Sequence, residues 1–152
     1  MNPLDTPLGY STNFLFVPGT RPERFAKALD SGASGVVLDL EDAVAEEDKV
    51  SARDAIRAAW PNFSAEQKKR LVIRTNSPGS KFYAADLILA QELQVACLLI
   101  PKSESLDQIN GAALILPNTA IIPMIETAIG LDQLKEIANS NQVIRLALGN
   151  LD

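Results

Sequence analysis

Side chains that could act as acids, bases or metal ligands follow one apolar run in a tight group. The run "GVVLDLEDAV" opens with Val36 and Val37 and then presents Asp39, Glu41 and Asp42. Carboxylates grouped in this way can take up and release protons, or bind a hard cation such as Mg²⁺ through oxygen. The end of this run is therefore a candidate reactive site.

Other apolar runs of the chain also end in polar groups. Arg74 and Asn76 follow "LVI", Lys102 follows "ACLLIP", Glu126 follows "AIIPMI", and Asp152 follows "VIRLALGNL". Taken singly, such an acid often caps the next helix, and such a lysine often pairs with nearby acids. Because these groups all fall at the same end of successive runs, we favour a functional cluster over independent structural roles.

Composition limits the chemistry that this cluster could perform. The sequence has no histidine and a single cysteine. Serine and cysteine triads, the usual zinc sites and imidazole proton relays are therefore excluded within this chain. Cys97 lies inside the apolar run "VACLLI", where a core residue is expected more often than a nucleophile. Any reaction must use carboxylates, lysine, arginine or a hard metal ion.

Length, charge and hydropathy indicate a soluble globular chain. Its 152 residues, 47% of them hydrophobic, can bury a core without disulfides. The net charge of -5 argues against a nucleic-acid-binding surface. No apolar run approaches the roughly 20 residues of a membrane-spanning helix, and the N-terminus lacks the features of a secretory signal. We expect a cytoplasmic protein without nucleic-acid or membrane partners.

Short apolar runs alternate with segments of helical periodicity along the chain. The runs begin near residues 14, 35, 71, 96, 120 and 143. After the first run, "TRPERFAKALDSG" predicts a helix that opens with Thr20 and Glu23 in capping-box spacing and closes at Gly32. Further helices are predicted from Glu46 to Trp60 and within "DLILAQEL", "SLDQINGAA" and "GLDQLKEIANS".

This alternation predicts an α/β fold in which crossover helices join parallel strands. Both an open doubly wound sheet and a closed barrel fit the pattern. The first turn, "VPGTRPERF", has one glycine and matches neither the dinucleotide-binding nor the P-loop pattern, so we favour the barrel. In a barrel of parallel strands the carboxyl ends form one rim, which is where catalytic groups of this fold lie.

Strand alternation assigns directions to the first acids. Asp39 and Glu41 share a face with Val37 and should point into the barrel mouth, whereas Leu38 and Leu40 should point to the other face.

Two further charged residues are predicted to lie outside the cluster at the barrel mouth. Asp42 has the opposite parity from the mouth acids, so we expect it to support the following loop or helix start. Arg145 lies away from the carboxyl end of the last run, so we expect a surface or inter-helix contact rather than a ligand role.

A series of ordered blocks resembles one known family. The blocks are "FLFVPGTRPERFAKAL", "GVVLDLEDAV" followed by "EEDKVSAR", "VIRTN", "LLIPKSES", "PMIETAIGL" and "ALGNLD". They are similar to consecutive blocks of the citrate lyase beta-subunit-like family, the acyl-CoA lyases of the HpcH/HpaI aldolase superfamily. The resemblance covers the chain from residue 14 onward. It implies a TIM (β/α)8-type barrel over residues 14–152, preceded by an N-terminal extension, residues 1–13.

The resemblance also implies an activity and a set of site residues. The family binds one Mg²⁺ and cleaves or forms a carbon-carbon bond beside a carbonyl, typically in a coenzyme A thioester of a hydroxy acid such as citryl-CoA or malyl-CoA. By motif, the implied metal ligands are Glu126 and Asp152, the implied catalytic or pocket residues are Asp39, Glu41 and Lys102, and the implied substrate-binding residues are Arg74, Asn76, Gly19 and Arg21. The last two belong to a block that contacts the coenzyme A end of the substrate.

Several points stay open at this stage. The residues do not decide which acid is the general base. A thioester hydrolase, or an aldolase that forms pyruvate without coenzyme A, could use the same site.

An eight-stranded barrel takes about 250 residues, so a chain that stops after the sixth predicted strand is expected to be truncated or part of a longer protein. Its unpaired edges invite association, and a homo-oligomer is expected. A catalytically silent partial barrel is the non-enzymatic alternative.

Overall fold

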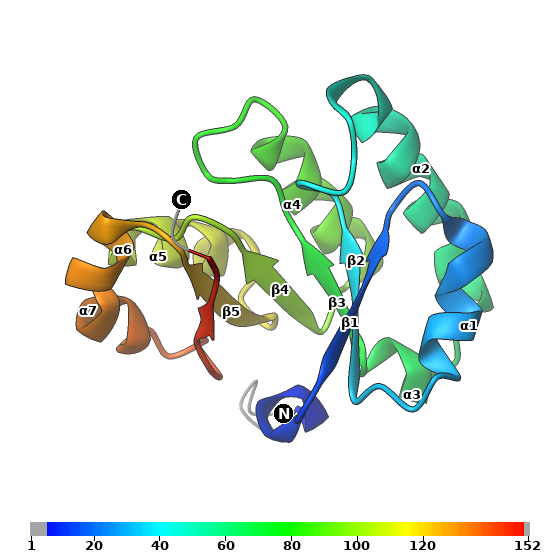
Figure 1. The fold of residues 1–152 in the computed structure, drawn as a ribbon, viewed down its shortest axis with the longest axis horizontal. Coiled ribbons are helices and arrows are strands. Elements are labelled where there is room, and N and C mark those ends of the chain that lie inside the picture. The colour runs from blue at the N-terminus through cyan, green and yellow to red at the C-terminus, as the bar shows by residue number, and fades with distance from the viewer. Residues whose placement is uncertain (1–5, 151–152) are drawn as a thin grey trace.

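Six parallel strands form one sheet and follow one another in chain order (Figure 1). The computed structural model describes residues 6–150. The strands are β1 (Phe14–Pro18), β2 (Gly35–Asp39), β3 (Leu71–Arg74), β4 (Cys97–Ile100), β5 (Ala120–Ile125) and β6 (Ala147–Leu148). Strands β1 to β5 coincide with predicted apolar runs. Strands β2 to β5 are buried over almost their whole length and are therefore largely apolar, whereas Leu15 and Phe16 of β1 are exposed.

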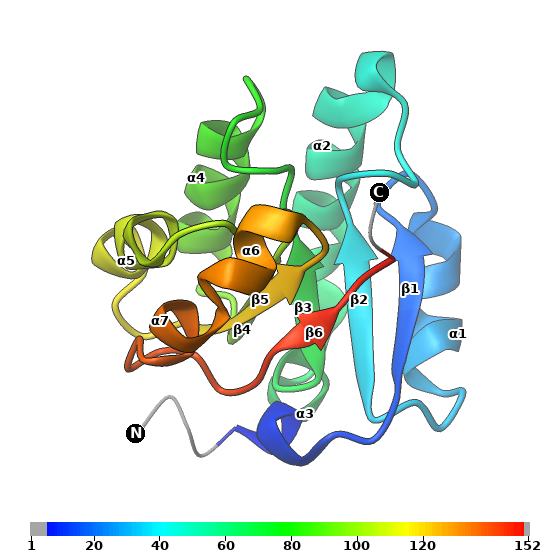
Figure 2. The same ribbon diagram turned by 60° about the vertical axis from the view of Figure 1, so that its left-hand side comes forward.

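Helices connect the strands and cover the outer face of the curved sheet (Figures 1 and 2). The α-helices are α1 (Phe25–Leu29), α2 (Lys49–Ala59), α3 (Ala65–Lys68), α4 (Tyr83–Leu93), α5 (Leu106–Ile115), α6 (Ala128–Asp132) and α7 (Leu134–Ala138). Short 3-10 turns are η2 (Pro7–Tyr10), η3 (Pro22–Arg24), η4 (Glu46–Asp48) and η5 (Trp60–Asn62). The predicted α/β architecture is confirmed.

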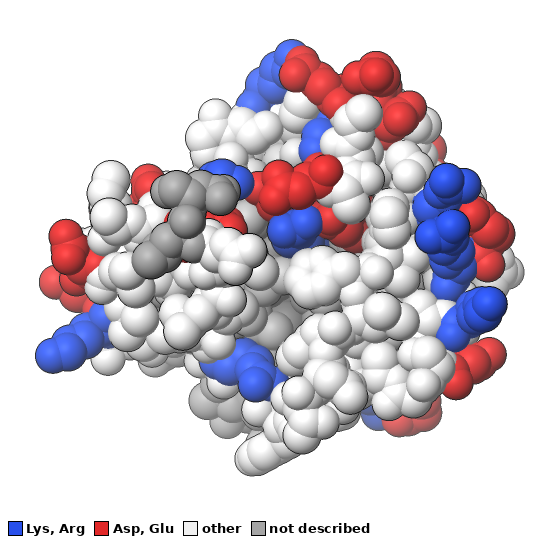
Figure 3. Space-filling view, viewed as in Figure 1, with Lys and Arg blue, Asp and Glu red and all other residues white. Residues whose placement is uncertain are grey.

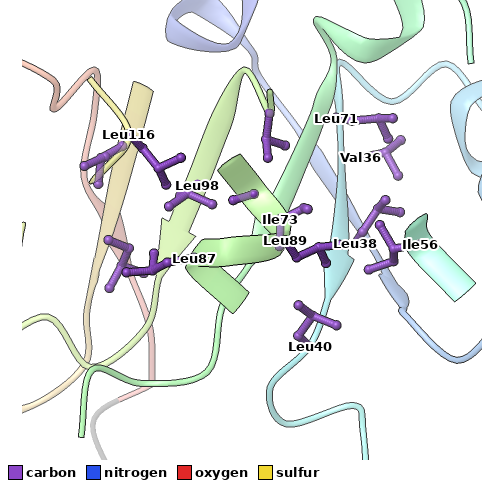
Figure 4. Close-up of a cluster of buried hydrophobic side chains, with 14 of the residues drawn as sticks. Val36, Leu38, Leu40, Ile56, Leu71, Ile73, Leu87, Leu89, Leu98 and Leu116 are labelled. Carbon is purple, nitrogen blue, oxygen red and sulfur yellow. The ribbon is translucent and has the colours of Figure 1, made fainter. Parts of the chain in front are cut away.

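Alternate residues of each strand enter two separate apolar clusters. Leu38 and Ile73 pack with Ile56 of α2 and Leu89 of α4 between the sheet and the helices (Figure 4). Their neighbours on the opposite parity, including Val37, Val72, Cys97 and Leu99, form a second cluster on the inner face. The predicted split between Val37 and Leu38 is confirmed, as is the core position of Cys97, whose thiol pKa is raised by burial.

The inner face of the curved sheet borders an apolar hollow of about 300 Å³. Arg145 lies at the N-terminal side of this hollow, where its Nη1 donates to the carbonyl oxygens of Leu8 at 3.3 Å and Ser11 at 2.5 Å. Its guanidinium carbon also lies 5.3 Å from the centre of the Phe14 ring. Arg145 therefore joins the segment before β6 to the turn η2, and it has a structural contact away from the strand ends.

The structure departs from the predicted element ends at three places. The first helical segment has no side-chain cap: Arg21 and Arg24 precede η3 and α1 without a capping hydrogen bond, so the capping box predicted at Thr20 and Glu23 is wrong. The segment "GLDQLKEIANS" forms two short helices, α6 and α7, instead of one. The last apolar run contributes only two residues to β6, with a separate bridge between Ile121 and Val143.

Both outer strands keep a free edge within residues 6–150. β1 pairs with β2 and β6 pairs with β5, and β1 and β6 are not paired with each other. Since eight strands close a barrel of this class, the described part forms a curved, open portion of one. Within the same residues, no helix is both long and apolar enough to cross a membrane.

Candidate functional site

The register of β2 and β3 brings Asp39 beside Arg74 at the carboxyl ends of both strands. Arg74 donates from Nε to Asp39 Oδ1 at 2.7 Å and from Nη2 to Oδ2 at 2.6 Å, a paired geometry that suits a planar guanidinium. Asp39 is fully buried and also accepts from the backbone N–H groups of Glu41 and Ala43, at 2.9 and 3.2 Å. Because its oxygens are used in this way, the geometry favours a positioning role for Asp39.

Glu41 is the acid that the fold leaves partly unsatisfied. Its side chain is buried, and Oε1 accepts a hydrogen bond from Lys102 Nζ at 2.8 Å. Arg74 Nη1 lies 3.0 Å from Oε2, yet Oε2 receives no well-directed hydrogen bond from the residues that the structure describes. Burial raises the pKa of Glu41, and Lys102 and Arg74 oppose that shift in part. This carboxyl is therefore suited to proton exchange.

Lys102 joins the acids of two different strand ends. Its backbone N–H donates to Glu126 Oε1 at 2.8 Å, while its Nζ donates to Glu41. The residue has a φ of 48°, in the left-handed region, where a side chain with a Cβ costs roughly 1–2 kcal/mol. The hydrogen bond to Glu41 raises the pKa of Lys102 and keeps it cationic. This strained residue thus brings Glu41 and Glu126 into one charged cluster.

Glu126 directs one carboxylate oxygen toward the end of β6. Its Oε1 is held by Lys102, whereas a Cβ added at Gly149 would lie only 2.8 Å from Oε2. Only glycine leaves room there for the acid in this position. The sequence contained a signal for this contact, the glycine of "ALGNLD", but its role was missed.

A polar cavity of about 390 Å³ opens beside Glu126 at the carboxyl ends of the strands. Its lining residues are Asp42, Arg74, Met124, Glu126, Leu148, Gly149 and Asn150. Charged side chains of both signs border the upper end of the central hollow, and the surface below them is largely uncharged (Figure 3). We call this space the mouth cavity.

Asp42 belongs to the mouth cavity, contrary to its predicted place in the following loop. Its carboxylate is exposed and lies 3.9 Å from Arg74 Nη1. The prediction was wrong because β2 ends at Asp39, so the two-residue alternation of a strand no longer decides where Asp42 points.

Asn76, which follows β3, is hydrogen-bonded to Asp86 of helix α4. Its backbone N–H and its Nδ2 donate to Asp86 Oδ2 at 2.7 and 2.8 Å, and Arg53 Nη1 donates to Asp86 Oδ1 at 3.0 Å. Nearby, Lys49 Nζ donates to the carbonyl oxygens that follow β2, those of Leu40 at 2.7 Å and Glu41 at 2.6 Å. None of these three supporting charges was predicted, although the spacing of lysine and arginine in "DKVSAR" placed both on one helix face.

Gly19 and Arg21 lie on the loop that follows β1. The N–H of Gly19 donates to the carbonyl oxygen of Asp39 at 2.8 Å, and a Cβ at this position would approach that oxygen to 2.9 Å. Arg21 is exposed, and its closest acidic neighbour is Glu23 at 3.7 Å. Gly19 thus has a packing role, and the predicted contact of this loop with coenzyme A stays a prediction.

Among the described residues, the side chains that line the mouth cavity fit one carboxylate ligand for Mg²⁺, Glu126. Glu126 offers an oxygen that borders open space, which a hard cation prefers. Residues 6–150 contain no group of three or more acidic, cysteine or histidine side chains that could enclose a metal ion. The second predicted ligand, Asp152, lies outside the described residues.

The chain matches the family model described as HpcH/HpaI aldolase/citrate lyase over residues 13–152. A citrate lyase subunit beta-like protein of Mycobacterium tuberculosis is 36% identical over 139 residues, covering 91% of this chain and 47% of the relative. A (3S)-malyl-CoA thioesterase of Cereibacter sphaeroides is 29% identical over 138 residues, covering 91% and 48%.

Solved structures show the same fold. The citrate lyase beta subunit of M. tuberculosis complexed with oxaloacetate and magnesium matches with a TM-score of 0.81 and 34% identity, covering 98% of this chain and 60% of that one. The protein CitE from the same organism, in complex with magnesium, acetoacetate and coenzyme A, also has a TM-score of 0.81 at 34% identity, covering 93% and 49%. The chain spans about half the length of the curated relatives. It belongs to the HpcH/HpaI aldolase/citrate lyase family.

Proposed function

We propose that the protein is a Mg²⁺-dependent carbon-carbon lyase that acts on a coenzyme A thioester of a hydroxy acid, of the citryl-CoA or malyl-CoA kind. The observation that carries the proposal is the bridge through Lys102, which brings a buried acid of raised pKa, Glu41, next to a cavity-facing acid, Glu126. The relatives described with magnesium, oxaloacetate and coenzyme A support it.

Glu126 would hold the metal ion, with Asp152 proposed as the second protein ligand. Bound there, Mg²⁺ would supply Lewis-acid stabilisation of the negative charge that develops on substrate oxygen during cleavage. Gly149 keeps the space beside Glu126 Oε2 free, and Lys102 fixes the other oxygen of the carboxylate.

Glu41 is our candidate for the group that exchanges the proton. In the cleavage direction, its carboxylate takes the proton of the substrate hydroxyl, a carbonyl forms at that carbon, and the carbon-carbon bond breaks. The electron pair of that bond passes to the carbon beside the thioester as an enolate, and that carbon then takes up a proton to give the acyl-CoA. Lys102 stays hydrogen-bonded to Oε1 of Glu41, so the proton would be taken up at Oε2, which has no hydrogen-bond donor among the described residues and lies 3.0 Å from Arg74 Nη1.

Arg74 borders the same cavity and is proposed to attract the substrate carboxylate. Its Nε and Nη2 are occupied by Asp39, so the contact would use Nη1, the nitrogen nearest Glu41 and Asp42. Asp39 would then orient the guanidinium, because a paired hydrogen bond fixes its plane. Asn76, Gly19 and Arg21 remain proposed substrate-binding residues.

The decisive experiment replaces Glu126 with glutamine in the full-length protein. Glu126→Gln should lower Mg²⁺-dependent release of ketoacid from malyl-CoA or citryl-CoA roughly 10³-fold, the effect of losing several kcal/mol of charge stabilisation. Glu136→Gln, at an exposed position of α7, is the matched control and should behave as wild type. Activity that persists without Mg²⁺ and is unchanged in Glu126→Gln would overturn the proposal.

Thioester hydrolysis is the second candidate, because one relative is a (3S)-malyl-CoA thioesterase. A lyase acting on malyl-CoA yields a ketoacid and an acyl-CoA, so no free thiol is released. A hydrolase yields free coenzyme A and no ketoacid. Assaying free thiol and ketoacid separately in one reaction distinguishes the two activities.

A further inference from the structure

Helix α2 places two cations against the sheet, one turn apart. Lys49 is 7% exposed and Arg53 is 9% exposed, although both residue types are rarely buried without partners. Neither residue lines the mouth cavity. Lys49 holds the main chain directly after β2 through two carbonyl oxygens. Arg53 instead donates a hydrogen bond to Asp86, which is itself hydrogen-bonded to Asn76 after the end of β3.

Asp86 connects Arg53 to the end of β3. The carboxylate lies in the first turn of α4, is fully buried, and accepts three hydrogen bonds. One oxygen accepts from Arg53, and the other accepts from both the backbone N–H and the side-chain amide of Asn76. The guanidinium carbon of Arg53 also lies 5.9 Å from the centre of the Phe82 ring, which limits its movement.

A buried charge pair at this place needs an explanation other than stability. Desolvation of two charges costs free energy, and apolar residues of similar size often stabilise a core at least as well. The pair instead restricts the orientation of a neighbouring side chain. A carboxylate that accepts hydrogen bonds from three fixed donors allows only one orientation of the Asn76 amide. That amide follows the strand that carries Arg74.

We propose that Asp86, held by Arg53, is a positioning residue that orients Asn76 at the strand ends. The inference deepens the proposed function, since it gives Asn76 a defined orientation for substrate binding. Asp86 and Arg53 do not contact the substrate. They act through Asn76, from the helix side of the sheet.

Amide hydrogen exchange measured by NMR tests the positioning directly. In Asp86→Asn, one acceptor oxygen is replaced by a donor, and exchange of the Asn76 backbone N–H should accelerate at least tenfold. The N–H of Thr75 donates to the Leu99 carbonyl oxygen, at 3.1 Å, and should keep its rate. Asp107→Asn, at an exposed acid in the first turn of α5, is the matched control and should change neither rate.

Two outcomes of this exchange experiment would overturn the proposal. One is an unchanged exchange rate at Asn76 in Asp86→Asn. The other is an equal acceleration at Thr75 and Asn76, which would mean a general loss of stability. If Asp86→Asn does not fold, Arg53→Lys keeps the charge but alters the hydrogen bond, and the same two amides decide the result.

A double-mutant cycle then connects the positioning to ligand binding. Binding of oxaloacetate in the presence of Mg²⁺ is measured by calorimetry for Asn76→Ala, Asp86→Asn and the double variant. If Asp86 acts through Asn76, each single change should weaken binding about tenfold and the double variant should be no weaker than Asn76→Ala. Fully additive losses would overturn the proposal. If the wild-type chain binds no oxaloacetate, the proposed function fails, and the exchange rates still decide the positioning role.

Discussion

At the residue scale, the acid that ends β2 and the two acids that follow it have three different environments. Asp39 is fully buried and fully hydrogen-bonded, Glu41 is buried with one oxygen left without a hydrogen bond, and Asp42 is exposed at the mouth cavity. Burial raises the pKa of Glu41, while Lys102 and Arg74 lie beside its carboxylate. Glu41 is therefore the acid of this group that we expect to exchange a proton.

The titration of Glu41 predicts a specific pH dependence of stability. Because burial raises its pKa above the ordinary value of 4.5, the folded chain binds this proton more tightly than the unfolded chain does. The free energy of unfolding should therefore fall as pH rises from 4.5 through the folded-state pKa, and Glu41→Gln should lack that decrease. Urea denaturation at a series of pH values measures it. Glu136→Gln should follow wild type in parallel, and a parallel curve for Glu41→Gln would contradict the prediction.

Gly149 gives a second prediction at this scale. In Gly149→Ala the new Cβ would crowd Glu126 Oε2, so the carboxylate must turn away from its present position. We expect Mg²⁺ affinity to fall roughly 10- to 100-fold, as for other changes that disturb the support of a metal ligand. Calorimetric titration with Mg²⁺ measures the affinity.

The matched control for this substitution is Gly79→Ala, where an added Cβ meets no atom within 4 Å. It should bind Mg²⁺ as wild type does. Equal Mg²⁺ affinity in wild type and Gly149→Ala would show that Glu126 does not need this space.

At the scale of elements, the stability of a short helix depends on the hydrogen bonds at its ends and on its packing against the core. α5 starts with a complete capping box, in which the Ser105 hydroxyl accepts from the Gln108 N–H at 3.3 Å and the Gln108 side chain accepts from the Ser105 N–H at 3.3 Å. The cap satisfies two donors that a helix start would otherwise leave free. It also ends the loop that carries Lys102.

Removing this cap should destabilise the chain measurably. Ser105→Ala should lower the free energy of unfolding by about 1 kcal/mol. Ser51→Ala, at an exposed position inside α2, should change it by less than about 0.5 kcal/mol. Both values come from urea denaturation at a fixed pH, and an equal effect of the two changes would mean that the cap contributes nothing.

At the scale of the whole molecule, the open sheet has a free edge at β1. Leu15 on this strand is 40% exposed, and an unpaired strand without charges is a site for association with other chains. The relatives are about twice as long as this chain, and eight strands close a barrel of this class. Within residues 6–150, the β1 edge is therefore open to pairing with a further strand.

Placing a charge on the β1 edge should reduce association. Leu15→Lys should lower the concentration-dependent rise in sedimentation coefficient that the wild-type chain is expected to show, because a lysine at an edge opposes strand pairing. Leu114→Lys, at a residue 83% exposed on α5, changes the charge equally away from the edge. A reduction of equal size in both variants would contradict a role for the β1 edge.

Much of the fold could be predicted because its signals are local. Strands β2 to β5 are covered on both faces and are apolar over most of their length, and β1 to β5 were all found from their apolar runs. The common direction of the strand ends follows from parallel pairing, so Arg74, Lys102 and Glu126 could be expected at one rim. The capping box expected at Thr20 was wrong, because residue types permit a cap but the chain path decides whether it forms.

The sequence by itself determined the fold class, the opposite faces of Val37 and Leu38 on β2, and the restriction to carboxylate, lysine, arginine and metal chemistry. Only the tertiary structure decided which charged side chains are paired with other groups inside the protein and which line the mouth cavity. Strand register pairs Asp39 with Arg74, and the approach of α4 gives Asn76 its partner Asp86. The physical reason is that an apolar run determines its own burial, whereas a charged group depends on a partner that lies far away in the sequence.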